Sequence, residues 1–158
     1  MSYPTTQSLA QSFDLTFRLI RMQTEGLTHA DSLLQLPFRG NCLNWVLGHI
    51  LVGRNTALQL LGQKLIWRAA EVSRYESGSE PITGDEHVLP LERLLQDLER
   101  SQERIEAGLS NLSEEDLATS VDGRSLGEHL AGLHWHETYH TGQLEILRQL
   151  AGKNDAIV

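Results

Sequence analysis

The sequence has a single cysteine and no long hydrophobic run. Cys42 stands alone among 158 residues, so the chain cannot form an internal disulfide, which agrees with a reducing compartment. The longest apolar stretch, around 43–52, is interrupted by polar residues and is far shorter than the roughly 20 apolar residues of a membrane span. The first residues show neither the basic nor the apolar segment of a secretory signal. We therefore expect a cytoplasmic protein that has no membrane span.

Basic residues are also scarce. The chain has 13 Lys and Arg against 21 Asp and Glu, a formal net charge of −8, and its basic residues form no cluster. Because affinity for nucleic acid depends mainly on clustered Lys and Arg, nucleic acid is excluded as a general partner. Hydrophobic residues make up 40% and charged residues 22%, which are ordinary values for a soluble domain. The length fits one domain over 1–158.

Four segments carry apolar residues at helical spacing, and none shows the alternation of a strand. This pattern predicts an all-α protein, and four long helices favour a four-helix bundle. Asn41 is the expected N-cap of the second helix, and Ser125 with Glu128 forms a capping-box pattern at the start of the fourth. The helices are expected at about 6–25, 42–61, from just after Val88 to about Leu109, and 125–150. The predicted core is Leu9, Phe13, Phe17, Ile20, Leu43, Val46, Leu47, Ile50, Leu58, Leu61, Leu91, Leu94, Leu95, Leu98 and Ile105.

The connections between these helices differ in length. The link 62–88 has 27 residues, among them Gly78, Pro81 and Gly84, and so long a link is usually a functional or a mobile loop. The links 26–41 and 110–124 resemble each other, and at an offset of 83 several Leu and Gly residues coincide. This weak repeat suggests two related helix-loop-helix halves.

The main chemical signal is a group of histidines. Four of the seven lie within twelve residues of the last expected helix. His136 and His140 are four residues apart, so both imidazoles lie on one face, about 6 Å apart along the axis. This is metal-ligand spacing, and imidazole suits Zn, Ni, Cu or Fe. A third ligand from another helix would leave coordination positions open, as in catalytic sites.

The segment His136-Glu137-Thr138-Tyr139-His140 also matches the zinc-protease pattern in which Glu is the general base. Such enzymes need a third ligand, but the 18 residues after His140 contain no His and only one Glu, too near to serve. A peptidase also needs a strand edge on which to hold its substrate. These points disfavour a protease. The missing ligand is better sought upstream, in Asn44–Ile50.

Two motifs together resemble the DinB/YfiT superfamily of metal-binding four-helix bundles. They are Asn44-Trp45-x-x-Gly48-His49-Ile50 and Trp135-His136-Glu137-x-x-His140-x-Gly142-Gln143-Leu144, with Arg148 after them. The resemblance covers nearly the full chain. It departs from the family pattern at Cys42, where a small or hydroxyl residue is common, and in two extra histidines, His129 and His134.

The resemblance implies an up-down-down-up bundle, usually a homodimer, that holds a divalent metal through His49, His136 and His140. Three neutral imidazoles suit Zn and Ni about equally. Members of the superfamily resemble thiol-dependent transferases or isomerases that use bacillithiol, mycothiol or glutathione, although many have no assigned activity.

Three further residues are candidates for catalysis. Glu137 lies about 100° around the helix from His136, which suits a hydrogen bond behind the ligands or a surface position. Gln143 faces the same side as His140, so its amide can orient a ligand or a substrate. His129 lies about 10 Å from His136 along the axis, too far to share the metal but able to meet a substrate.

Other notable side chains have simpler interpretations. His134 points away from His136 and is expected to be structural or exposed. Cys42 is expected to be a small buried hydrophobe. Trp45 and Trp135 are assigned to the core.

The favoured function is metal-assisted S-transfer, in which an open metal site binds a low-molecular-weight thiol or polarises a small electrophilic substrate. A metal lowers the pKa of a bound thiol or water, and the chain itself offers no evident nucleophile. The same ligands would serve a hydrolase that activates water, with Glu137 or His129 as proton acceptor. A non-catalytic metal-binding stress protein is the third hypothesis.

Overall fold

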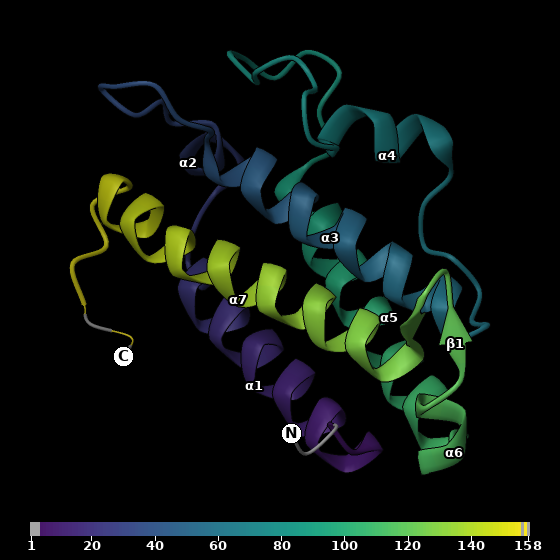
Figure 1. The fold of residues 1–158 in the computed structure, drawn as a ribbon. Coiled ribbons are helices and arrows are strands. Elements are labelled where there is room, and N and C mark those ends of the chain that lie inside the picture. The colour runs from purple at the N-terminus through teal and green to yellow at the C-terminus, as the bar shows by residue number, and fades with distance from the viewer. Residues whose placement is uncertain (1–3, 156, 158) are drawn as a thin grey trace.

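The computed structural model describes residues 4–155 and 157, and these residues are almost entirely helical (Figure 1). Four long helices form the bundle, so the all-α prediction is confirmed. Shorter helices and a small antiparallel hairpin occupy the connections. The elements are α1 (Thr6–Thr24), α2 (His29–Ser32), α3 (Leu43–Leu60), α4 (Ala69–Tyr75), α5 (Leu91–Ser110), α6 (Glu114–Leu117), β1 (Ser120–Val121), β2 (Arg124–Ser125) and α7 (Leu126–Leu150).

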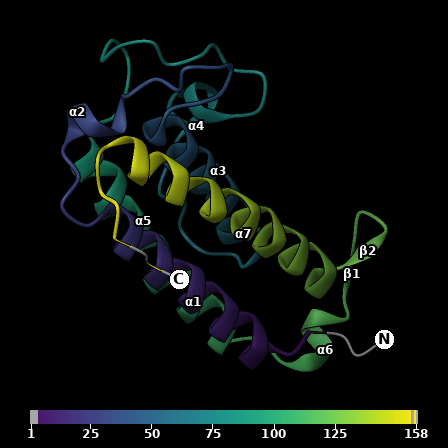
Figure 2. The same cartoon turned by 90° about the vertical axis from the view of Figure 1, so that its left-hand side faces the viewer.

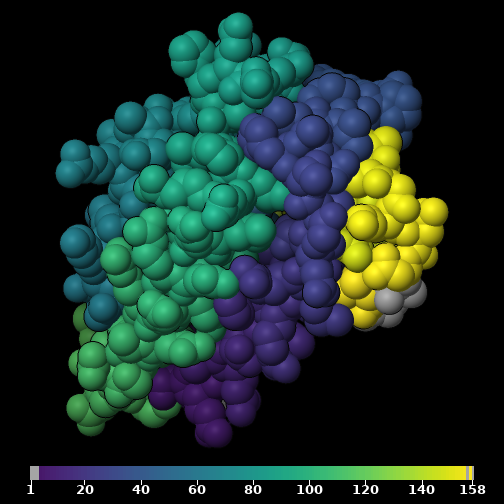
Figure 3. Space-filling view, turned by 180° about the vertical axis from the view of Figure 1, so that it is seen from behind, coloured from purple at the N-terminus to yellow at the C-terminus, as the bar shows by residue number. Residues whose placement is uncertain are grey.

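The four long helices surround the core, and each packs on two of the others. α1 and α7 run in one direction, and α3 and α5 run in the other (Figure 1). α7 packs on α1 and α3, and α5 packs on the same two helices. The space-filling view from behind shows α1 and α5 meeting along their length and closing that face (Figure 3).

The link between α3 and α5 is more ordered than the sequence suggested. Because these two helices run in the same direction, the chain must return along the bundle, and on this path it forms α4 beside α3 (Figure 2). Trp67, Tyr75 and Ile82 of this link are buried in the core. The indole N–H of Trp67 donates to the buried carboxylate of Asp97 at 2.8 Å. The expected loop 62–88 is therefore partly a helix and partly core.

The ends of the long helices test the capping predictions. At the start of α7 the Ser125 hydroxyl accepts from the Glu128 amide at 3.2 Å, and the Glu128 carboxylate accepts from the Ser125 amide at 2.8 Å, which confirms the capping box. Asn41 is not an N-cap, and that prediction was wrong. The N-cap of α3 is Cys42, which makes no side-chain capping bond. Its thiol is buried instead, so packing fixes where the helix begins.

The predicted core is confirmed with small adjustments. Of the fifteen residues expected inside, all are buried except Phe17 and Leu95, which are partly buried and pack against the core. No described helix combines the length and the apolar character that crossing a membrane requires.

The two halves of the chain share one layout. Each half has a long helix, a helix of four residues and a second long helix. The short helices α2 and α6 begin alike, with a hydroxyl and an aspartate in a capping box, at Thr28 with Asp31 and at Ser113 with Asp116. The first residues of α3 and α7, Leu43 and Leu126, are 126 − 43 = 83 residues apart, the offset of the weak repeat.

Candidate metal centre

Three histidines meet between α3 and α7. His49 lies in the second turn of α3, and His136 and His140 lie one turn apart on α7. One ring nitrogen of each lies within 4.8 Å of the other two. The Nε2 atoms of His49 and His136 are 3.0 Å apart. The structure thus brings together the three residues that the motifs single out.

Hydrogen bonds fix the protonation of two of these rings. The Nδ1 atom of His49 lies 2.8 Å from the carbonyl oxygen of Tyr75, and Nδ1 of His140 lies 2.8 Å from Oε1 of Gln143. Both oxygens accept, so each Nδ1 carries the proton and donates it. Each ring then offers the lone pair of Nε2, the form in which histidine binds metals.

The surroundings of His136 and His140 favour the neutral form of both rings. Burial, then the electrostatic influence of the neighbouring His49 ring, lowers the pKa of His136, and burial above all lowers the pKa of His140 to about 4. Near neutral pH both rings are therefore unprotonated and ready to bind metal. Two lone pairs facing each other at 3.0 Å repel unless a cation or a proton lies between them. The donor set fits a divalent ion that prefers imidazole.

The first motif holds the carbonyl that orients His49. Tyr75 is fully buried, donates its hydroxyl proton to Oδ1 of Asn44 at 3.0 Å and accepts from the Leu89 amide at 2.8 Å. A Cβ on Gly48 would lie 2.1 Å from the Tyr75 ring, so glycine is required for this ring to pack on α3. Asn44 and Gly48 therefore act on His49 through the α4 segment.

The two tryptophans of the motifs have different surroundings. Trp45 is buried, as predicted, stacks on His49 with ring centroids 4.6 Å apart and donates its indole N–H to Ser79. Trp135 is 69% exposed, so its assignment to the core was wrong. It lies with the exposed Tyr139 on the outer side of α7, one turn apart and beside the histidines.

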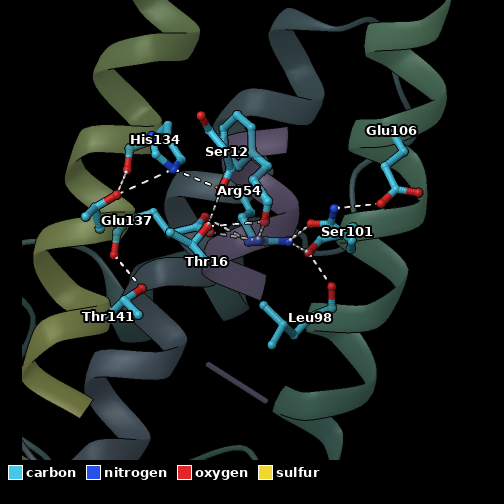
Figure 4. Close-up of polar contacts among 12 residues, drawn as sticks. Ser12, Thr16, Arg54, Leu98, Ser101, Glu106, His134, Glu137 and Thr141 are labelled. Carbon is cyan, nitrogen blue, oxygen red and sulfur yellow. Dashed lines mark hydrogen bonds and ion pairs between the residues drawn. The ribbon is translucent and has the colours of Figure 1, made fainter. Parts of the chain in front are cut away.

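Glu137 points into the bundle and away from the histidine cluster. Its carboxylate is buried and pairs with Arg54, with Nε to Oε2 at 2.8 Å and Nη2 to Oε1 at 2.7 Å. Thr16 donates to Oε1 at 2.5 Å. Arg54 Nη1 donates to Ser101 and Gln102. We call these five residues the clasp, since they join α1, α3, α5 and α7 (Figure 4).

The contacts of Glu137 in the clasp test the two positions expected for it, a hydrogen bond behind the ligands or a surface position. A surface position is wrong, because 3% of the residue is exposed. A carboxylate held by a guanidinium and a hydroxyl is also unsuited to take a proton at the metal site. Sequence reasoning missed Arg54, although a lone arginine in an apolar helix was a signal. Its offset from Glu137, 137 − 54 = 83 residues, is that of the repeat.

The remaining candidate residues differ in whether they contact the histidine cluster. Gln143 reaches the cluster through His140. His129 does not: its Nε2 lies 2.8 Å from the carbonyl oxygen of Val121, next to the hairpin. His134 is structural, as expected, and contacts the carbonyl oxygen of Ser12 at 3.1 Å. Gln143 therefore lies at the histidine cluster, and His129 lies away from it.

Comparisons with known proteins settle the family. The model of the DinB superfamily matches residues 12–144, more than four-fifths of the chain. The chain belongs to the DinB superfamily. Its fold is similar to a solved structure described as the conserved protein of locus from Enterococcus faecalis, with a TM-score of 0.72 and 15% sequence identity over 95% of this chain and 98% of that one. No curated protein matches the sequence.

In this DinB-superfamily protein the histidines border an open pocket of about 600 Å³. Cys42 does not line it; the thiol is buried, and burial raises its pKa, which makes it a poor nucleophile. Aromatic and aliphatic side chains dominate the wall. The lining includes the three histidines and Phe38, Arg39, Trp45, Trp135, Tyr139, Gln143 and Ile146.

Proposed function

We propose that this protein binds one divalent metal, Zn or Ni, through His49, His136 and His140 and activates a low-molecular-weight thiol for transfer to a small electrophile. The observation that carries the proposal is the convergence of three imidazoles, two with their Nδ1 protons already engaged, at the wall of an open pocket. A bound metal would supply a Lewis acid that lowers the pKa of a coordinated thiol. Three protein ligands leave positions open for it.

The pocket residues favour an external nucleophile. The described residues of its lining include no cysteine. The Tyr75 carbonyl and Gln143 orient the ligand rings, and the aromatic side chains of Trp45 and Trp135 offer an apolar wall for the electrophile. Bacillithiol, mycothiol and glutathione are thiols of the proposed kind.

A thiol is favoured over water by the position of the acidic and basic groups. A metal-bound hydroxide still carries a proton, and a hydrolase needs a group near the metal to transfer a proton to the leaving group. Glu137 is bound in the clasp and His129 is bound at the hairpin. A thiol is acidic enough to lose its proton to bulk solvent once a metal binds it, so it does not need either residue.

The first test is elemental analysis of protein purified without a chelator or a metal-affinity tag. We expect about one metal ion per chain in the parent and in the control His134→Ala, and none in His49→Ala/His136→Ala. A parent that stays empty after incubation with Zn or Ni would refute the metal site.

The second test is turnover of the metal-loaded protein with each thiol and a chromogenic electrophile. We expect thiol-dependent conjugation that the double variant lacks. A loaded protein that conjugates no thiol but hydrolyses esters or amides would support the hydrolase instead. A loaded protein with neither activity would support a non-catalytic metal-binding protein.

A further inference from the structure

The pocket differs in charge from the rest of the molecule. The chain carries 21 acidic residues and a net charge of −8, yet among the described residues that line the pocket none is Asp or Glu. Arg39 is the one Lys or Arg in that lining. A divalent ion on the histidines would add further positive charge. The lining therefore carries a positive formal charge in an acidic protein, which favours anionic ligands.

Arg39 is placed to meet a ligand. It lies in the loop 33–42 between α2 and α3, at the end of the bundle where α7 ends (Figure 1). Within the described part of the chain its guanidinium has no carboxylate at ion-pair distance, whereas Arg18, Arg21 and Arg148 each have one. An exposed guanidinium in a pocket wall is suited to bidentate recognition of a carboxylate.

The other feature of the wall is a group of large apolar side chains open to solvent. Phe38 is 66% exposed, Trp135 69%, and Tyr139 and Ile146 58% each, and all four line the pocket. Exposed apolar residues scattered over a surface need no explanation, but a group of them around one hollow marks a binding site. The ligand must therefore present an apolar body as well as a charge.

We propose that the pocket selects a small amphiphilic molecule with a carboxylate, which Arg39 recognises, and an apolar body, which Trp135 and Tyr139 contact. This proposal rests on the proposed function and specifies its substrate class. The carboxylate is carried either by the thiol or by the electrophile. Glutathione and bacillithiol bear carboxylates and mycothiol does not, so with mycothiol the electrophile would have to carry the carboxylate.

The test measures binding of three matched probes to the zinc-loaded protein by calorimetry. Benzyl mercaptan and 4-(mercaptomethyl)benzoate differ in one carboxylate, and 4-methylbenzoate keeps the carboxylate but lacks the thiol. We expect the anionic thiol to bind about tenfold more tightly than the neutral one, the range of a charge-assisted hydrogen bond. Arg39→Ala should abolish this difference. Arg124→Ala, which removes an exposed arginine outside the pocket, should preserve it.

The outcomes separate the two proposals. Equal affinity for both thiols in the parent, or an equal loss in the two arginine variants, would overturn the carboxylate proposal and leave the metal and thiol chemistry intact. If neither thiol binds but 4-methylbenzoate binds and depends on Arg39, carboxylate recognition holds and the proposed thiol function fails. If binding of both carboxylate probes depends on Arg39, the carboxylate can be carried by either the thiol or the electrophile. If only the binding of 4-(mercaptomethyl)benzoate depends on Arg39, the thiol must carry the carboxylate.

Discussion

Two polar groups of side chains lie between α3 and α7, and they are built in opposite ways. In the clasp, all five N–H groups of Arg54 have acceptors, and both carboxylate oxygens of Glu137 accept hydrogen bonds. In the histidine cluster the Nδ1 protons of His49 and His140 are engaged, and the Nε2 atoms of His49 and His136 lie 3.0 Å apart with no carboxylate or guanidinium of the described residues between them. One group satisfies its buried charges with protein atoms alone, and the other has three imidazoles placed so that they could hold a metal ion.

The comparison separates a structural site from a functional one. Buried polar groups are stable in a protein when each donor and acceptor has a partner, and the clasp meets this condition. A group of imidazoles beside an open pocket is a candidate site for a ligand. Neighbouring positions on α7, His136 and Glu137, therefore serve different purposes because they face different sides of the helix.

The largest effect is expected at the clasp. Glu137→Leu leaves the buried Arg54 guanidinium without its carboxylate, which should lower the free energy of unfolding by about 3–5 kcal/mol. The metal content of the folded protein should not change, because the clasp faces away from the histidines. Urea denaturation of the metal-free protein and elemental analysis of the folded protein measure the two properties.

A double variant provides the control for this change. Arg54→Met/Glu137→Leu removes both charges, so we expect it to recover most of the lost stability. Glu137→Gln, which keeps the shape, covers the case in which the leucine variant does not fold. Loss of metal from these variants while their unfolding midpoints stay unchanged would show that Glu137 belongs to the metal centre and that the two groups are one site.

A smaller effect is expected from the group that orients His140. Gln143→Ala removes the acceptor of the Nδ1 proton, so the ring is free to rotate and to change tautomer, and metal affinity should fall about 10–100-fold. Competition with a chromophoric chelator measures this metal affinity. Gln149→Ala is the matched control, since Gln149 is exposed on the same helix and contacts Glu145 instead. Equal affinities in the two variants would contradict the orienting role.

Local patterns in the sequence predicted much of this arrangement. Helical spacing is enough to place His136 and His140 together, because both belong to one helix. The capping box of α7 and most of the core follow from the same short-range rules. His49, in contrast, was assigned by resemblance to a family, since no local pattern distinguishes a ligand from a buried histidine in an apolar helix.

Long-range contacts account for what the sequence did not predict. Tyr75 orients His49 from a segment that gave no helical signal, and Arg54 meets Glu137 across the bundle, 83 residues away. Trp135 was misplaced for a related reason. Apolar residues on a helix are assigned to the core by default, and whether one of them lines an open pocket instead depends on its neighbours in the fold.

The smallest expected effect is a pH dependence of stability that comes from the histidine cluster. Burial holds the pKa of His140 at about 4, whereas in the unfolded chain the pKa is near the ordinary histidine value of 6.5. Between these values the unfolded chain binds more protons, so the metal-free protein should lose stability as pH falls from about 6.5 to 4, and bound metal should be released in the same direction.

Acid also protonates carboxylates such as Asp31 and Asp116, whose pKa values are lowered by hydrogen bonds from Thr28 and Ser113, so the parent alone cannot isolate the contribution of His140. The measurement is therefore the difference in urea midpoint between pH 7 and pH 5 for metal-free parent and for metal-free His140→Gln. We expect a smaller difference in the variant, because glutamine does not titrate. The same difference in urea midpoint in both proteins would mean that protonation of His140 does not lower the free energy of unfolding. The cluster would then no longer differ from a solvated surface group, and the contrast with the clasp would be lost.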